Sequence, residues 1–122
     1  MPTAPRQATD AARRPRTRAE IAPLLHELKA GLRDLYGERL ARLVLYGSFA
    51  RGEATDASDI DVLVVLRGEV DEWAEIKRMS HVTQPIALDY EELIADLPLS
   101  LNEYETRQSP LLINVRNEGI VL

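Results

Sequence analysis

Two aspartates stand two residues apart where a long apolar run begins. Asp59 and Asp61 flank Ile60, the first residue of an expected strand over residues 60–66. Because successive side chains of a strand alternate faces, both carboxylates point to the same side. Neighbouring negative charges repel each other, and a cation relieves this cost. Oxygen ligands of this kind favour Mg²⁺ or Mn²⁺ over zinc; the alternative is a pair of solvated acids at a strand end.

Gly47-Ser48 provides the second part of a candidate site. It follows an apolar strand expected over residues 40–46 and precedes a short helical turn expected over 49–52. Glycine lets a ligand approach the backbone closely, and the amides at a helix start attract anions. Arg51 could neutralise a triphosphate, or it could be an ordinary surface arginine. Beside a metal-binding carboxylate pair, this turn is the arrangement that a nucleoside triphosphate needs.

A third carboxylate would complete a two-metal site, and Asp89 is the best candidate. It lies near the end of a third strand, expected over residues 85–90. For Ser48, Asp59 and Asp89 to meet at one rim, the second strand must run antiparallel to the other two. The alternative role for Asp89 is the N-cap of a short helix expected over residues 91–97.

The remaining sequence predicts the elements that hold these residues in place. Thr17 and Glu20 form a capping box before a helix with one leucine-rich face, which Gly37 ends. Pro23 conflicts with this start and should kink the helix. Further helices are expected over residues 70–80 and 110–118, and Trp73 is expected in the core. The order predicts an α+β fold, with a small three-stranded antiparallel or mixed sheet covered by helices.

Length and charge restrict the function. The 122 residues allow one domain, predicted over residues 17–122 after a flexible basic tail over residues 1–16. Residues 1–18 carry five arginines and one aspartate, a net charge of +4. Because the whole chain has a net charge of −5, residues 19–122 carry −9. The acidic body argues against nucleic acid as the main ligand. The basic tail could contact an acidic partner or a phosphate chain, or it could only keep the chain soluble. No apolar run is long enough for a membrane span, so a cytoplasmic protein without a membrane partner is expected.

These residues resemble a known family pattern. Gly47-Ser48, ten intervening residues and Asp59-Ile60-Asp61 resemble the nucleotidyltransferase superfamily that includes DNA polymerase beta and kanamycin nucleotidyltransferase. Ala50-Arg51-Gly52 and the serine before Asp59 are similar to the minimal nucleotidyltransferase (MNT) subfamily, over roughly residues 20–122. The resemblance implies the polymerase beta-like fold and an enzyme that transfers AMP from ATP. It also implies that Gly47 and Ser48 hold the triphosphate, that Asp59 and Asp61 bind Mg²⁺, and that Asp89 binds metal or acts as general base.

The acceptor is restricted by size. Larger relatives that modify aminoglycosides have a second domain for the drug, and 122 residues leave no room for one. The MNT resemblance implies an antitoxin, of a type VII-like toxin–antitoxin system, that transfers AMP to a tyrosine of a partner HEPN toxin. The apolar C-terminal residues could bury against such a partner in a homo- or hetero-oligomer, or complete the domain's own core. A non-catalytic antitoxin and a transferase for a small molecule such as an aminoglycoside stay open as alternatives.

Overall fold

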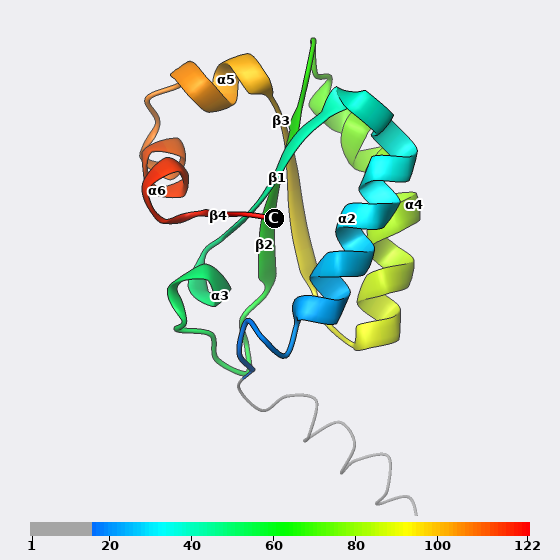
Figure 1. Cartoon of the computed structure of the whole chain (residues 1–122), viewed down its shortest axis with the longest axis vertical. Coiled ribbons are helices and arrows are strands. Elements are labelled where there is room, and N and C mark those ends of the chain that lie inside the picture. The colour runs from blue at the N-terminus through cyan, green and yellow to red at the C-terminus, as the bar shows by residue number, and fades with distance from the viewer. Residues whose placement is uncertain (1–15) are drawn as a thin grey trace, which may run out of the picture.

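The computed structural model describes residues 16–122, and its centre is a four-stranded mixed sheet between two layers of helices (Figure 1). The predicted flexible tail, apart from Arg16, lies outside the described residues. None of the helices in the described part is long and apolar enough to cross a bilayer. In chain order the elements are α2 (Ala22–Tyr36), the 3₁₀ helix η1 (Gly37–Arg39), β1 (Leu40–Tyr46), α3 (Ser48–Arg51), β2 (Ile60–Leu66), α4 (Glu72–Tyr90), β3 (Ile94–Ser100), α5 (Leu101–Thr106), α6 (Pro110–Glu118) and β4 (Ile120–Val121).

The sheet has the strand order β3-β2-β1-β4. β2 runs antiparallel to β1, as predicted, and β4 adds a short antiparallel pairing at the other edge of β1. β3 runs parallel to β2, so the prediction that the second strand runs antiparallel to both other strands is wrong at this pair. The reason is α4, because a crossover helix returns the chain to the same end of the sheet. The α+β class with a mixed sheet is confirmed.

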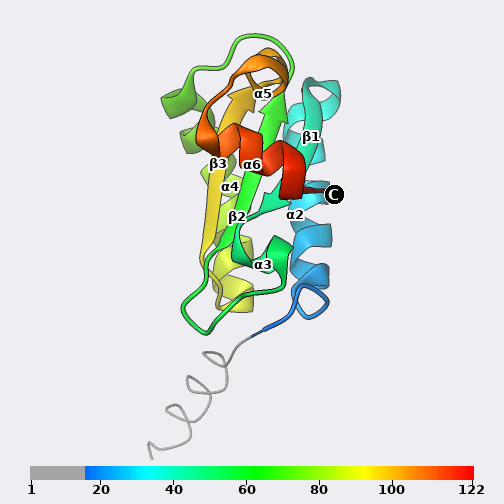
Figure 2. The ribbon, with the colours of Figure 1, turned by 90° about the vertical axis from the view of Figure 1, so that its left-hand side faces the viewer.

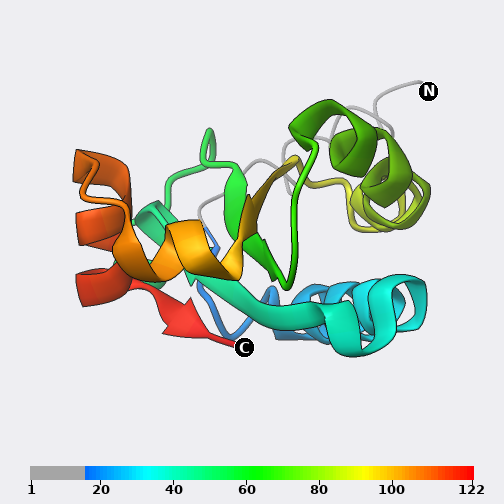
Figure 3. The same ribbon diagram turned by 90° about the horizontal axis from the view of Figure 1, so that it is seen from above.

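The two faces of the sheet have separate cores. α2 and α4 cover what we call the first face, and α5 and α6 cross the second face (Figures 1 and 3). Alternate residues of β2 serve the two cores: Val62 and Val64 pack under α2 and α4, whereas Leu63 and Val65 pack under α5 and α6. A strand that is buried on both faces is apolar almost throughout. This alternation places Asp61 on the second face.

The capping box of Thr17 and Glu20 forms as predicted. The Glu20 amide donates to Thr17 Oγ1 at 3.2 Å, and the Thr17 amide donates to Glu20 Oε1 at 3.0 Å. It closes a separate turn, however, and α2 begins only at Ala22. Pro23 therefore lies in the first turn of α2, where a missing amide costs nothing, and the predicted kink is wrong. Gly37 ends the helix with φ 57°, as predicted.

The strand predicted over residues 85–90 is wrong, and so is the helix predicted over 91–97. α4 runs through Pro85 to Tyr90, and the next strand, β3, begins only at Ile94. Ile76, Met79, Val82 and Ile86 recur at helical spacing and pack in the core of the first face. This packing outweighs the cost of one proline in the helix. Trp73 is 82% exposed, so its predicted place in the core is also wrong.

Candidate functional site

Gly47 and Asp61 meet where β1 ends and β2 begins. Tyr46, the last residue of β1, pairs with Asp61 across the antiparallel ladder. Gly47 then turns the chain with φ 75°, a conformation that favours glycine. A Cβ atom at Gly47 would lie 2.3 Å from Asp61 Oδ2. The turn therefore needs glycine for two reasons, its backbone conformation and the carboxylate that lies against it.

The single-turn helix α3 holds Ser48 beside this contact. Phe49 is 1% exposed and anchors the turn in the core of the first face. The Arg51 amide donates to the Gly47 carbonyl at 3.1 Å, and Gly52 ends the helix in the left-handed region with φ 74°. Ser48 is half-buried and stands at the first position of α3. The structure thus brings together Gly47, Ser48 and Asp61.

Asp59 is presented by a hydrogen-bonded loop. The Thr55 amide donates to Ser58 Oγ at 2.8 Å, and the Ala57 amide donates to Thr55 Oγ1 at 3.2 Å. Asp59 follows this turn and is exposed, whereas Asp61 is half-buried. Burial raises the pKa of Asp61, the charge of Asp59 raises it further, and Arg51 opposes both. A bound cation would relieve this electrostatic cost.

Arg51 lies among three acids of the site. Its Nε is 2.8 Å from Glu53 Oε1, and its Nη1 is 4.0 Å from Glu118 Oε2. It also interacts electrostatically with Asp61. Glu118, the last residue of α6, was missed by the sequence analysis because nothing local links it to residue 51. Since the Arg51 side chain is 44% exposed, it can turn from these carboxylates toward an anion.

Asp89 does not have the place that the sequence predicts. It is an exposed residue in the last turn of α4 and not the end of a strand. Within residues 16–122 no group of three or more histidine, cysteine, aspartate or glutamate side chains is arranged to hold a metal ion. The strand-end argument for Asp89 as the third carboxylate therefore fails.

β3 has no carboxylate on the face of the site. Its residue in register with Asp61 is Ala95, which is exposed. Its acid, Asp96, pairs in register with Val62 and so lies on the first face. There it interacts with Thr83 of α4, and burial raises the pKa of Asp96 while the hydrogen bonds oppose this. Sequence reasoning could not separate Ala95 from Asp96 without knowing the strand boundaries.

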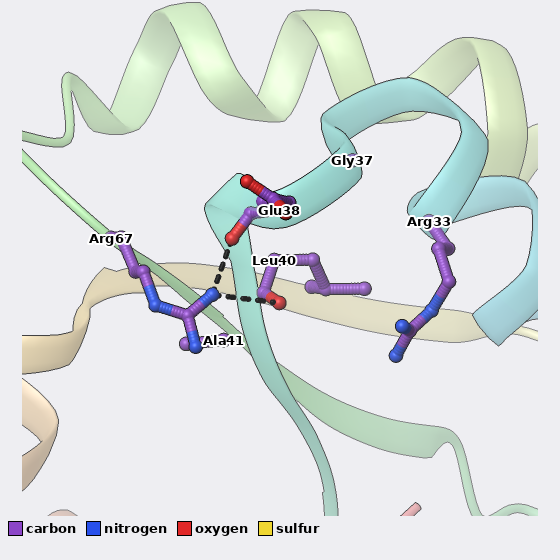
Figure 4. Close-up of a pocket in the computed structure, with 6 residues that line it drawn as sticks. All are labelled: Arg33, Gly37, Glu38, Leu40, Ala41 and Arg67. Atoms are coloured by element: carbon purple, nitrogen blue, oxygen red, sulfur yellow. Dashed lines mark hydrogen bonds between the residues drawn. The ribbon is translucent and has the colours of Figure 1, made fainter.

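A hollow lies at the end of the sheet opposite the candidate site, and Arg67 has a structural role there. It is lined by residues from the end of α2, the start of β1 and the end of β2 (Figure 4). Arg67 Nη1 donates to the carbonyl of Glu38 and lies 3.5 Å from the carbonyl of Leu40 (Figure 4). Arg33 lines the same hollow. Arg67 thus closes the turn between α2 and β1.

Comparison with known proteins identifies the family and the fold. Residues 25–120 match the family model described as nucleotidyltransferase domain. A Methanocaldococcus jannaschii protein, provisionally named a protein adenylyltransferase, is 27% identical over 83% of this chain and 97% of its own. The fold is similar to a toxin–antitoxin structure with AMP-PNP (TM-score 0.58, 21% identity, 79% of this chain and 69% of that one). It is also similar to a chain in the complex of tri-AMPylated Shewanella oneidensis HEPN toxin with MNT antitoxin (TM-score 0.50, 21% identity, 79% and 66%). The expected nucleotidyltransferase fold is therefore confirmed, and the chain belongs to the nucleotidyltransferase domain family.

Proposed function

We propose that this nucleotidyltransferase moves AMP from ATP to the hydroxyl of a protein tyrosine, with Mg²⁺ or Mn²⁺ held by Asp59 and Asp61. The observation that carries the proposal is the contact between Gly47 and Asp61. This contact places the candidate phosphate-binding turn directly against Asp61, one of the two candidate metal ligands. A triphosphate on the turn would share its cation with these carboxylates.

The residues present fit a divalent ion that is completed by phosphate. Asp59 and Asp61 offer hard oxygen donors, and burial together with the charge of Asp59 raises the pKa of Asp61, which a bound cation would counteract. Mg²⁺ is commonly held by one or two carboxylates together with substrate phosphates and water. When bound, the ion would neutralise charge on the triphosphate and on the departing pyrophosphate.

The chain's own residues would bind and orient the nucleotide. Gly47 lets the triphosphate approach the backbone, the Ser48 hydroxyl donates to a phosphate oxygen, and Arg51 turns toward the phosphates. The acceptor oxygen forms a bond to the α-phosphorus, and the bond from that phosphorus to the β-phosphate oxygen breaks. Pyrophosphate leaves, and the acceptor proton passes to solvent. Catalysis of this kind is mainly positioning and charge stabilisation.

A partner protein suits the chain as acceptor, and we propose a HEPN-domain toxin neutralised by this chain as its antitoxin. The similar M. jannaschii protein is named for transfer to protein, and the two similar structures come from toxin–antitoxin complexes. The chain also has apolar surface for a partner. Leu112 and Val115 of α6 complete the core of the second face, whereas Leu111, Ile113 and Val121 are 42%, 39% and 60% exposed. The C-terminal apolar residues thus serve the domain's core and leave a surplus on the surface.

A second candidate function, inhibition by binding alone, is favoured by one observation. Within the described residues Asp59 and Asp61 have no third carboxylate arranged with them to hold a metal ion, and the neighbouring β3 residue on their face is Ala95. A binding-only antitoxin would have no need for a third carboxylate. The same fold would then act as a scaffold for the toxin.

The test is to incubate the protein with Mg²⁺, ATP labelled at the α-phosphate and the toxin encoded beside it, and to locate the label by mass spectrometry. We expect AMP on a toxin tyrosine, loss of label with Asp59→Asn/Asp61→Asn, and retention with Asp96→Asn, an acid on the opposite face. Absence of a labelled product with every nucleotide would overturn the transferase proposal. Full neutralisation of the toxin by the double variant at equal protein levels would favour binding alone.

A further inference from the structure

The side of α4 that points away from the sheet carries apolar side chains on the surface of the described chain. Trp73, Leu88 and Leu93 are 82%, 78% and 69% exposed, the three highest values among the large apolar side chains of residues 16–122. A row of exposed residues at helical spacing, which we call the outer stripe of α4, consists of Trp73, Lys77, His81, Gln84 and Leu88. The opposite side of α4 packs in the core of the first face, and the helix forms one side of the molecule (Figure 3). Exposed apolar residues gathered in this way indicate an interaction surface.

The two ends of the outer stripe differ in shape. At the C-terminal end lies a hollow of about 590 Å³, lined by Gln84, Ala87, Leu88, Glu91, Glu92 and Leu93. At the N-terminal end the side chain of Trp73 projects into solvent. Leu88 follows Trp73 by fifteen residues, which is about 22 Å along a helix axis. One helix face therefore has a large aromatic side chain at one end and a hollow with apolar walls at the other.

This face is complementary to itself. When two copies of α4 lie antiparallel about a two-fold axis, Trp73 of each copy reaches the hollow of the other. Both contacts form together, so the assembly closes at two copies. Tryptophan is a frequent anchor of protein interfaces because it buries a large area in a pocket. We propose that the chain forms a homodimer through the outer stripe of α4, with Trp73 of each copy in the hollow beside Leu88 and Leu93 of the other. This inference is independent of the proposed transfer activity.

Charges on α4 agree with the antiparallel arrangement. Lys77 is exposed one turn after Trp73, and helical side chains lean toward the N-terminus of their helix, so Lys77 leans toward the hollow of the other copy. Beside that hollow, Asp89 and Glu91 are exposed and form no ion pair with another described residue. They stand at the C-terminus of α4, where the helix dipole also favours a cation. Glu72 precedes Trp73 and so lies about 100° away from it around the helix.

The dimer would leave the candidate site open. Asp61 lies on the second face of the sheet, which α5 and α6 partly cover. Seen from that face, α2 and α4 lie behind the sheet (Figure 2). A second copy on the outer side of α4 therefore does not obstruct Gly47, Ser48 or Asp61, and an acceptor protein can reach the site of each copy.

The fluorescence of Trp73 tests this contact directly, because the chain has one tryptophan. Sedimentation velocity and tryptophan emission are measured for the full chain from roughly 1 to 200 μM, because one helix face buries too little surface for a tight dimer. We expect a monomer–dimer equilibrium, with emission that moves to shorter wavelength as the dimer forms. Trp73→Ala and Leu88→Glu should each weaken association about tenfold or more, because each removes an anchor of the interface. Leu111→Glu, the same kind of exchange at an exposed position of α6, is the control and should leave association unchanged.

A mixture of the two variants separates this reciprocal interface from a general loss of apolar surface. A pair of Trp73→Ala with Leu88→Glu keeps one complete contact, between Trp73 of one copy and the intact hollow of the other, whereas either variant alone keeps none. The mixture should therefore associate more tightly than either variant. The tryptophan emission of Leu88→Glu should move to shorter wavelength when Trp73→Ala, which has no tryptophan, is added. Circular dichroism confirms that the variants are folded, as expected for substitutions of exposed residues.

Four results would overturn the inference. A parent chain that is monomeric up to the highest concentration has no such dimer, and protection of Trp73 by the toxin alone would then assign the outer stripe to a different protein. A dimer that is unaffected by Trp73→Ala and Leu88→Glu uses another surface. A mixture that associates no better than its components shows that Trp73 does not enter the hollow. Growth beyond two copies means that the contact does not close about a two-fold axis.

Discussion

Gly47 and Asp61 are so close that a methyl group on Gly47 would stand 2.3 Å from Asp61 Oδ2. No ordinary pair of non-bonded heavy atoms tolerates this distance, so the carboxylate and the turn occupy mutually dependent positions. The antiparallel register of β1 and β2, which pairs Tyr46 with Asp61, creates the contact. Strand pairing thus places a candidate metal ligand against a candidate phosphate-binding turn.

Gly47→Ala should therefore abolish transfer. The new methyl group must displace Asp61 or the turn, and we expect at least a 100-fold loss in rate because misplacement by about 1 Å is costly in positional catalysis. Gly52→Ala is the matched control, because Gly52 also has a positive φ, of 74°, but has nothing within 4 Å of the new methyl group. Gly52→Ala should lose about 1–2 kcal/mol of stability from its left-handed backbone. Gly47→Ala should lose more, because φ 75° and ψ −156° lie in a region that is essentially restricted to glycine and because the methyl group meets Asp61. Rate assays and thermal unfolding separate the two effects, and equal losses of rate would contradict the argument.

Asp61→Asn should stabilise the metal-free protein while it removes activity. Burial and the charge of Asp59 raise the pKa of Asp61, so its ionised form destabilises the fold. The gain in the variant should be about 0.5 kcal/mol, because water screens a half-buried carboxylate. An acid with a raised pKa destabilises fully above its folded-state pKa, and this cost disappears as the pH falls toward the ordinary value of 3.8.

Thermal unfolding from pH 7.5 to 4 tests this prediction. The difference in thermal stability between Asp61→Asn and the parent chain should be largest at pH 7.5 and should decrease as the pH falls. Mg²⁺ should stabilise the parent chain more than the variant. A parent chain that is more stable than the variant at pH 7.5 without metal would show that Asp61 is already compensated by its surroundings.

The sequence predicted the first half of the fold well because its signals are local. Gly47 ends β1, the apolar run over residues 60–66 forms β2, and Gly37 ends α2. The second half differs from the prediction because Pro85 and the apolar residues after it belong to α4 and not to a strand. Whether a helix passes through a proline depends on packing against a distant element, here α2, and that information is not local.

The candidate site could likewise be predicted only where its residues are close together in the sequence. Asp59, Asp61, Gly47 and Ser48 belong to one continuous stretch, so spacing and alternation were enough to group them. Asp89 was misplaced because its position depended on the wrong strand. Glu118 approaches Arg51 only through tertiary structure.

The hydrogen-bonded and ion-paired cluster around Glu75 should make the fold sensitive to substitution of this residue. Glu75 is 4% exposed and accepts hydrogen bonds from Tyr36 Oη at 2.7 Å, Arg39 Nη1 at 2.9 Å and Arg78 Nη1 at 2.6 Å. Burial acts to raise the pKa of Glu75, but these donors outweigh it and the pKa is lowered. Glu75→Gln should cost about 2–4 kcal/mol, because it leaves buried donors without their charged partner.

Denaturant unfolding checks this cost, with Lys77→Gln at an exposed position of α4 as the control, which should change stability by less than about 0.5 kcal/mol. An acid with a lowered pKa stabilises above its ordinary value of 4.5, and this contribution is lost as the pH falls through the folded-state pKa. The difference between Glu75→Gln and the parent chain should therefore narrow below pH 4.5. A difference that does not change with pH would show that packing, and not charge, accounts for the loss.

Ala95→Asp should turn the two-carboxylate site into one with three. Ala95 is exposed, pairs in register with Asp61 and lies on the second face, so a carboxylate there would stand beside the candidate metal ligands. We expect about tenfold tighter Mn²⁺ binding without nucleotide, measured by calorimetry, because affinity for hard cations rises with the number of charged oxygen ligands. Ala95→Asn is the control of equal size, and it should leave Mn²⁺ affinity nearly unchanged because it adds no charge. Equal Mn²⁺ affinity in the aspartate and asparagine variants would contradict the prediction. It would mean that position 95 does not face the ion and that Asp59 and Asp61 do not bind the metal on the side next to β3.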